Sequence, residues 1–250
     1  GMMSVGASAV NASDFTDADE IVNKDAVSTM TALGIINGKE DGSYFDPTGT
    51  VTRAEMAKML CVAINGGVDP VLGVKDTPTF TDIKGHWAES YIEYCAANGI
   101  IAGRGNNKFD PTGTVSATEA AKMLLGVLGY SAEKSGLVGN DWAINVAADA
   151  VNAGIAPKGI VLADAMTREQ AAQMAFQTLT ADTVYYTNKG TTVIGSDGMQ
   201  VIVGASAPVK VANSTTDDYR TVKGDKDEVQ QFCEKYFTDL ELRSDAATAV

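Results

Sequence analysis

Two arginines stand at the same place in a repeated pattern, and their side chains are the first candidates for binding chemistry. Residues 52–55 read Thr-Arg-Ala-Glu and residues 167–170 read Thr-Arg-Glu-Gln. The hydroxyl and the Glu or Gln three residues later predict a helix capping box, worth about 1 kcal/mol. Capping does not need Arg53 or Arg168. A guanidinium in a first turn suits a carboxylate, because it donates paired hydrogen bonds where unpaired amides and the helix dipole add positive potential.

The capping pattern also occurs at residues 116–119, where it lacks this arginine. Residues 116–119 read Ser-Ala-Thr-Glu, so the cap is kept while Ala117 takes the arginine position. Loss of the arginine without loss of the cap favours a role for Arg53 and Arg168 outside folding. The alternative is that both are ordinary solvated side chains.

The overall charge limits where an anion could bind. The 250 residues include 32 acidic and 19 basic side chains, giving a formal net charge of −13. This balance argues against non-specific binding to nucleic acid and against adsorption to an anionic membrane face. An anionic ligand would therefore need a locally basic pocket on an acidic protein.

The sequence offers little material for metal or cofactor chemistry. The single histidine, His86, cannot build a His-based zinc site, and we expect no cofactor. Cys61, Cys95 and Cys233 each lie in an apolar helical pattern, so we expect buried thiols rather than disulfides. No run of about 18 apolar residues is present, which predicts no membrane insertion.

The chain repeats one structural unit. The repeated segments are Phe-Thr-Asp (15–17 and 80–82), Gly-Ile-Ile (34–36 and 99–101) and Phe-Asp-Pro-Thr-Gly-Thr-Val (45–51 and 109–115). Each copy reads as helix, loop and helix, and a more divergent third copy follows. One helix pair cannot bury its own apolar face, so we predict a mainly α-helical fold with three repeats around a pseudo-threefold core.

The predicted boundaries follow from these repeats. The repeats are residues 13–66, 80–130 and 131–181, with a linker at 67–79 and an extension at 182–250. Residues 1–12 resemble the end of a secretory signal peptide, with a flexible N-terminus as the alternative.

The extension is predicted to contain a β-hairpin and a helix. Alternation across residues 191–204 predicts the hairpin, with Val193 opposite Val201 and Val203. A short strand is expected near 209–211. Asp225 is expected to cap an amphipathic helix that includes Val229.

The repeated segments resemble S-layer homology motifs, which occur as three tandem copies in bacterial surface proteins. The resemblance covers about residues 13–181 and includes His-Trp-Ala at 86–88. It implies a three-pronged helical module that holds a protein on the Gram-positive cell wall. The implied ligand is the secondary cell-wall polysaccharide, typically bearing a pyruvate ketal and bound in grooves between neighbouring motifs.

The resemblance carries a glycan-binding role to six positions of this sequence. They are Arg53, Arg168, Trp87, Trp142, Asp17 and Asp82. An arginine suits the ketal carboxylate, a tryptophan can pack on a sugar ring, and an aspartate can accept from hydroxyls. No copy is complete, since the first has Val22 at the tryptophan position and the second has Ala117. We expect one or two working grooves, for example one that collects Arg53, Asp82 and Trp87.

Simpler roles are open for the same residues. The tryptophans can be core aromatics, and the aspartates can cap the turns that follow them. Three functions are compatible with the sequence. The first is a secreted, non-catalytic module that binds cell-wall polysaccharide at the cell surface. The second is a structural protein that self-associates in a surface lattice, with vestigial glycan sites. A wall-acting enzyme is the third, but no carboxylate pair stands in a motif that assigns an acid and a base.

Overall fold

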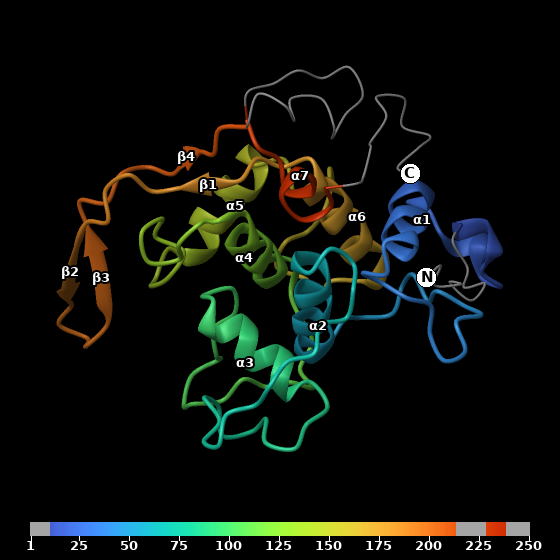
Figure 1. The fold of residues 1–250 in the computed structure, drawn as a ribbon, viewed down its shortest axis with the longest axis horizontal. Coiled ribbons are helices and arrows are strands. Elements are labelled where there is room, and N and C mark those ends of the chain that lie inside the picture. Colours follow the sequence, from blue (N-terminus) through green and yellow to red (C-terminus); the bar gives the residue numbers. More distant parts are fainter. Residues whose placement is uncertain (1–10, 214–228, 239–250) are drawn as a thin grey trace.

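The computed structural model describes residues 11–213 and 229–238 (Figure 1). This part of the chain is mainly helical, as the sequence predicts. Its α-helices are α1 (Lys24–Ala32), α2 (Arg53–Ile64), α3 (Glu89–Ala97), α4 (Ala117–Leu128), α5 (Trp142–Asn152), α6 (Arg168–Leu179) and α7 (Phe232–Tyr236). Two short 3-10 helices precede them, η1 (Ala12–Asp14) and η2 (Ala18–Glu20).

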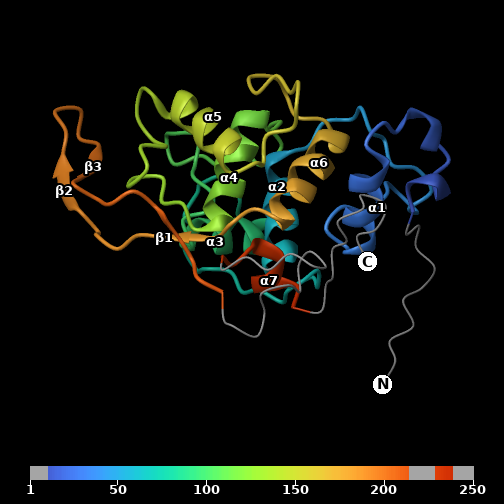
Figure 2. The same cartoon turned by 90° about the horizontal axis from the view of Figure 1, so that it is seen from above.

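The helices pack in pairs that join different copies of the repeat. Helix α3 packs on α2, α5 packs on α4, and α1 packs on α6 at the other end of the chain. In Figure 2, α2, α4 and α6 lie in the middle of the molecule and α1 lies at one end. Each predicted copy contains two of these helices, α1 and α2, α3 and α4, or α5 and α6. The first copy also closes onto the third, which buries apolar faces that no single copy covers.

Three backbone hydrogen bonds connect the starts of α2, α4 and α6. The Val51 amide donates to Met166, the Met166 amide to Val115, and the Val115 amide to Val51, at 3.3, 2.8 and 2.9 Å. All three residues are buried. We call these three residues the central ring. It supports a threefold arrangement of the repeats, which stays a prediction for the copies as a whole.

All three capping boxes form as predicted. In each box the hydroxyl of the cap residue accepts from the amide three residues on, and the side-chain oxygen of that later residue accepts from the cap amide. The pairs are Thr52 with Glu55, Ser116 with Glu119, and Thr167 with Gln170. These bonds are local, so they need only the correct residue types at the correct spacing.

The extension contains the predicted hairpin. Strand β2 (Thr191–Ile194) pairs with β3 (Gln200–Val203), and Val193 lies opposite Val201. Val203 pairs with Thr191 instead of Val193. The hairpin projects from the end of the molecule opposite α1 in both ribbon views. It is joined to the body by β1 (Val184–Tyr185) and β4 (Val209–Lys210).

Two boundaries differ from the expectation. Val229 is not in the final helix but forms an isolated bridge with Ala212, and Gln231 is the cap of α7. Asp225 and residues 214–224 lie outside the described part of the chain. At the other end, Ala12 is buried in η1, although it falls within residues 1–12, which the sequence assigned to a signal-peptide remnant or a flexible N-terminus.

The three cysteines are buried, as predicted. Cys61 on α2 lies 3.4 Å from Cys95 on α3, sulfur to sulfur. The contact with Cys61 and burial both raise the pKa of Cys95. In the described residues no helix has the length and apolar character needed to cross a membrane.

We therefore expect the thiols of the folded protein to resist alkylation, because burial shields all three from the reagent and the raised pKa of Cys95 disfavours its thiolate. Iodoacetamide should modify all three cysteines only after unfolding in guanidinium, which peptide mapping can measure. Rapid modification of Cys61 or Cys95 under native conditions would contradict the packing of α2 on α3.

Candidate ligand-binding site

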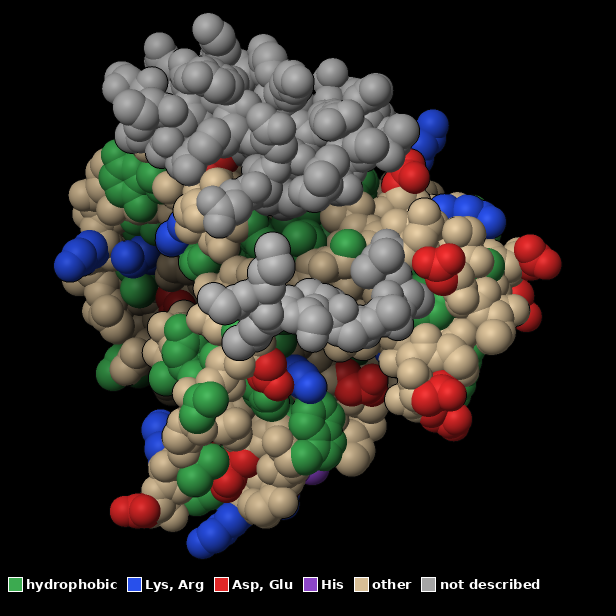
Figure 3. Space-filling view, turned by 45° about the vertical axis from the view of Figure 1, so that its right-hand side comes forward, with side chains coloured by type: hydrophobic (Ala, Val, Ile, Leu, Met, Phe, Trp, Pro, Cys, Tyr) green, Lys and Arg blue, Asp and Glu red, His purple; other side chains and the backbone are tan. Residues whose placement is uncertain are grey.

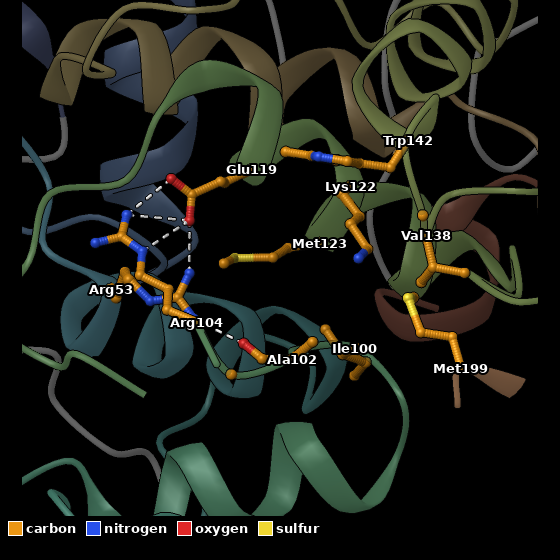
Figure 4. Close-up of a pocket in the computed structure, with 12 residues that line it drawn as sticks. Arg53, Ile100, Ala102, Arg104, Glu119, Lys122, Met123, Val138, Trp142 and Met199 are labelled. Atoms are coloured by element: carbon orange, nitrogen blue, oxygen red, sulfur yellow. Dashed lines mark hydrogen bonds and ion pairs between the residues drawn. The ribbon is translucent and has the colours of Figure 1, made fainter. Parts of the chain in front are cut away.

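A pocket of about 520 Å³ opens where the three copies meet (Figure 4). Arg53 comes from α2, Lys122 from α4, and Trp142 from the start of α5. The remaining lining residues are Ile100, Ala102, Gly103, Arg104, Glu119, Met123, Val138, Gly139 and Met199. One end carries the charged groups around Glu119, and the other is apolar.

Arg53 forms part of the charged end, but its side chain hydrogen-bonds to other groups of the protein. Its side chain is only 3% exposed. Its three guanidinium nitrogens donate to the Phe109 carbonyl, Glu119 and the Ala102 carbonyl, each at 2.7 Å. Its guanidinium carbon lies 4.4 Å from the centre of the Phe109 ring. Arg53 therefore clamps the loop of the second copy onto α2. Each of its three guanidinium nitrogens is already engaged by the protein, so it offers no paired donors to a ligand carboxylate.

Arg168 makes the same clamp one copy further round. It is 8% exposed and donates to the carbonyls of Phe45 and Asn37 at 2.8 and 2.6 Å. It also lies over the Phe45 ring, 5.0 Å from its centre. The first copy's loop is thereby attached to α6. This contact explains why two arginines recur at one position of the capping pattern.

The amides at these helix starts are also occupied. The amides of Arg53 and Ala54 donate to the carbonyls of Gly113 and Pro111. Those of Arg168 and Glu169 donate to Gly49 and Pro47 in the same way. We expected unpaired first-turn amides to attract an anion, and this was wrong, because the loop of another copy already satisfies them.

Glu119 lies between two arginines in the pocket. Arg104 donates to it at 2.8 Å, and Arg104 also donates to Asp110 and to the Thr114 carbonyl. Burial raises the pKa of Glu119, but the hydrogen bonds and charge of Arg104 outweigh it and leave the pKa below its usual range. Glu119 is therefore ionised, and both arginines are engaged by it.

Lys122 is the uncommitted cation of the pocket. Its ammonium lies 5.6 Å from the centre of the Trp142 ring, and no described carboxylate lies within ion-pair distance of it. Burial lowers the pKa of Lys122, while the nearby charge of Glu133 opposes the shift. In the sequence Lys122 is one of 19 basic residues, and nothing there shows that α4 meets the start of α5.

The two aspartates hold loops of their own copies. Asp82 accepts from the amides of Phe109 and Asp110 at 2.9 and 2.8 Å. Asp17 accepts from the equivalent amides of the first copy. These bonds fix the turn where Asp110 takes a positive φ of 61°. Both carboxylates are thus engaged with distant backbone amides. The simpler role, capping of the turn that follows, is wrong for Asp17, which makes no side-chain capping bond to η2.

The structure brings together a different set from the groove we expected. Arg53 and Trp142 share the pocket, while Asp82 and Trp87 are not among its lining residues. Trp87 is 57% exposed and packs against the rings of His86 and Tyr91. In the described residues no group of three or more His, Cys, Asp or Glu side chains is arranged to hold a metal ion.

Charged side chains on the surface are mixed. On the face in Figure 3, Lys and Arg side chains are scattered among acidic ones rather than gathered in one patch. Within the pocket the balance is reversed, because Arg53, Arg104 and Lys122 meet one carboxylate, that of Glu119. The pocket is therefore a locally basic site on a protein of net charge −13.

Comparison with known proteins identifies the class of this repeat. A family model described as the S-layer homology domain matches residues 14–57 and 79–121. These are two copies, and the family model does not match the third. These two matches show that the chain carries S-layer homology domains. It is accordingly a protein of the bacterial cell surface and wall.

Similar proteins have different names. The chain is 28% identical to exoglucanase XynX of Acetivibrio thermocellus over 75% of its own length and 18% of that protein. It is 32% identical to an S-layer protein of Bacillus licheniformis over 41% of its length and 11% of that protein. An amylopullulanase of Thermoanaerobacterium thermosulfurigenes is 30% identical over 58% of this chain and 9% of that protein. The chain thus spans less than a fifth of each of these relatives.

Replacement of Arg53 should destabilise the fold. Arg53→Ala leaves the buried Phe109 carbonyl and the part-buried Ala102 carbonyl without this donor and removes the buried partner of Glu119, a loss of about 3–5 kcal/mol in the free energy of unfolding. Arg104→Ala, at a half-buried site, should cost about 1 kcal/mol. Urea unfolding measures both. Equal stability losses would show that Arg53 is not the clamp described above.

Replacement of Asp82 should loosen one loop in a pH-dependent way. Asp82→Asn weakens the pairing of two amides and should cost about 1–2 kcal/mol at neutral pH. Burial raises the pKa of Asp82, but the amides of Phe109 and Asp110 outweigh it and lower the pKa. The stabilisation is therefore full above the unfolded pKa of about 3.9 and is lost as the pH falls through the lower folded pKa.

Urea midpoints of the two proteins should accordingly converge on acidification below about pH 4. Asp76→Asn, in the exposed linker, is the control and should leave stability unchanged. A stability gap that does not depend on pH would contradict a role for the ionised carboxylate.

Proposed function

We propose that the chain is a non-catalytic anchoring module that binds an acidic cell-wall polysaccharide in the pocket between the copies. The observation that carries this proposal is the pairing of Lys122, which has no carboxylate partner among the described residues, with Trp142. An ammonium can bind a carboxylate of the ligand, such as a pyruvate ketal. An indole beside it offers a flat apolar surface to a sugar ring.

The ion pairs of Arg53 and Arg104 with Glu119 support anion binding indirectly. Because Glu119 is paired with Arg53 and Arg104, it adds little repulsion to an approaching anion. The two arginines then contribute positive potential without being the direct ligands. We therefore assign the direct contacts to Lys122 and Trp142, and we keep Arg53 as part of the wall.

The names of the relatives favour binding over catalysis. An exoglucanase, an amylopullulanase and S-layer proteins share this stretch, although it is a small part of each. A stretch common to proteins with different named activities is more simply a means of attachment than the source of any one activity. Weak contacts at one groove become strong attachment when a polymer engages several molecules or several grooves.

The test uses two matched pairs of variants. Lys122→Ala and Trp142→Ala should each weaken retention on purified cell wall about tenfold or more, since a charge-assisted bond or a stacked ring is lost. Lys84→Ala and Trp87→Ala remove an exposed lysine and an exposed tryptophan away from the pocket. These controls should bind as the unaltered protein does, and circular dichroism checks that all four variants fold.

The same assay on wall stripped of its acidic polysaccharide should show no retention. Retention that survives this treatment would overturn the proposal, and if light scattering also rises with concentration it would favour self-association in a surface lattice. Loss of binding in Trp87→Ala but not in Trp142→Ala would move the site to the exposed aromatic cluster.

A further inference from the structure

Met199 reaches the pocket from outside the repeats. It lies in the turn between β2 and β3 and lines the pocket beside Val138 (Figure 4). Figure 4 shows it at the end away from Arg53 and Glu119, with Lys122 and Trp142 between the two ends. Neither segment matched by the family model includes the hairpin. The contact is therefore not a feature of the matched repeat.

The backbone of this turn is fixed by its own hydrogen bonds. The Met199 amide donates to Asp197 at 3.0 Å, and its carbonyl accepts from the Gly195 amide at 2.8 Å. The Gly198 amide donates back to Gly195 at 2.9 Å, and Gly198 takes a positive φ of 79°. The position of Met199 is set before any ligand arrives, which lowers the entropic cost of contact with one.

The rest of the hairpin has little packing of its own. All four residues of β2 are exposed, and so are three of the four in β3. A two-stranded hairpin is marginally stable by itself in water. The chain nevertheless keeps this element with its tip at the pocket, where Met199 is 43% exposed. An exposed thioether at the rim is available to a ligand.

We propose that Met199 is a specificity-determining residue of the glycan site, which it supplies with an apolar wall opposite the ionic end. This inference rests on the proposed function. Val138 and Met199 form the apolar end of the pocket, and Met123 extends from there toward the charged end. Methionine is flexible and polarisable, and it adapts to irregular apolar surfaces such as the C–H face of a sugar or a methyl substituent. The favoured ligand therefore has an anionic group on one side and an apolar face on the other.

The experiment compares variants of the whole chain in binding a pyruvylated hexose methyl glycoside, measured by calorimetry. Met199→Ala should weaken binding about threefold or more, because apolar contact is lost. Met199→Asp should weaken binding further, since it places a carboxylate near an anionic ligand. Ile194→Ala, an exposed residue of the same hairpin outside the pocket lining, should not change the affinity.

Lys122→Ala, measured in parallel, separates the two proposals. If Lys122→Ala weakens binding and both Met199 variants bind as the unaltered protein does, the hairpin has no part in the site and this inference is overturned while the proposed function stands. If none of these variants changes the affinity, the pocket is not the site and both proposals fail. An equal loss in Ile194→Ala would overturn the inference as well, because the effect would then belong to the hairpin as a whole.

Discussion

The structure depends on the pairing of buried backbone groups in the central ring. Val51, Val115 and Met166 each carry an amide and a carbonyl in an apolar interior, where an unpaired polar group costs about 1–3 kcal/mol. Each amide finds its acceptor in a different copy. Removal of any one copy would leave the other two with orphaned groups. The copies therefore stabilise one another, and α1 closes on α6 although they stand far apart in the sequence.

The clamps at Arg53 and Arg168 follow from the same constraint. Once the central ring brings the loops beside the helix starts, the carbonyls of Phe109 and Phe45 lie within reach of the two guanidinium groups. Arginine satisfies several acceptors at once because its donors are held in a rigid plane, which lysine cannot do. This use explains the recurrence of arginine without a ligand. Because both arginines are engaged in this way, Lys122, which has no carboxylate partner among the described residues, is the cation of the pocket that can meet an anion.

An acidic protein with a basic pocket attracts an anionic polymer only at short range. At physiological ionic strength, exposed charges are largely screened beyond about 8 Å, so the surrounding acidic surface acts weakly on a ligand within the pocket. The partial burial of Lys122 reduces screening there and strengthens each contact. Residues outside the matched family segments, such as Trp142 and Met199, also line this site. Under the proposed function, variation in the third copy and the hairpin would change the ligand while the arginine clamps keep the fold.

The sequence by itself determined the features that depend on neighbouring residues. The capping boxes at Thr52, Ser116 and Thr167, and the pairing of Val193 with Val201, form from residue types at fixed spacing. Only the tertiary structure decided which distant groups meet. Two of the three acceptors of Arg53 are backbone carbonyls 49 and 56 residues away, and every residue carries such a carbonyl, so no pattern marks the right one. The meeting of Lys122 with Trp142 likewise depends on how α5 packs on α4, which the long-range pairing of the copies sets.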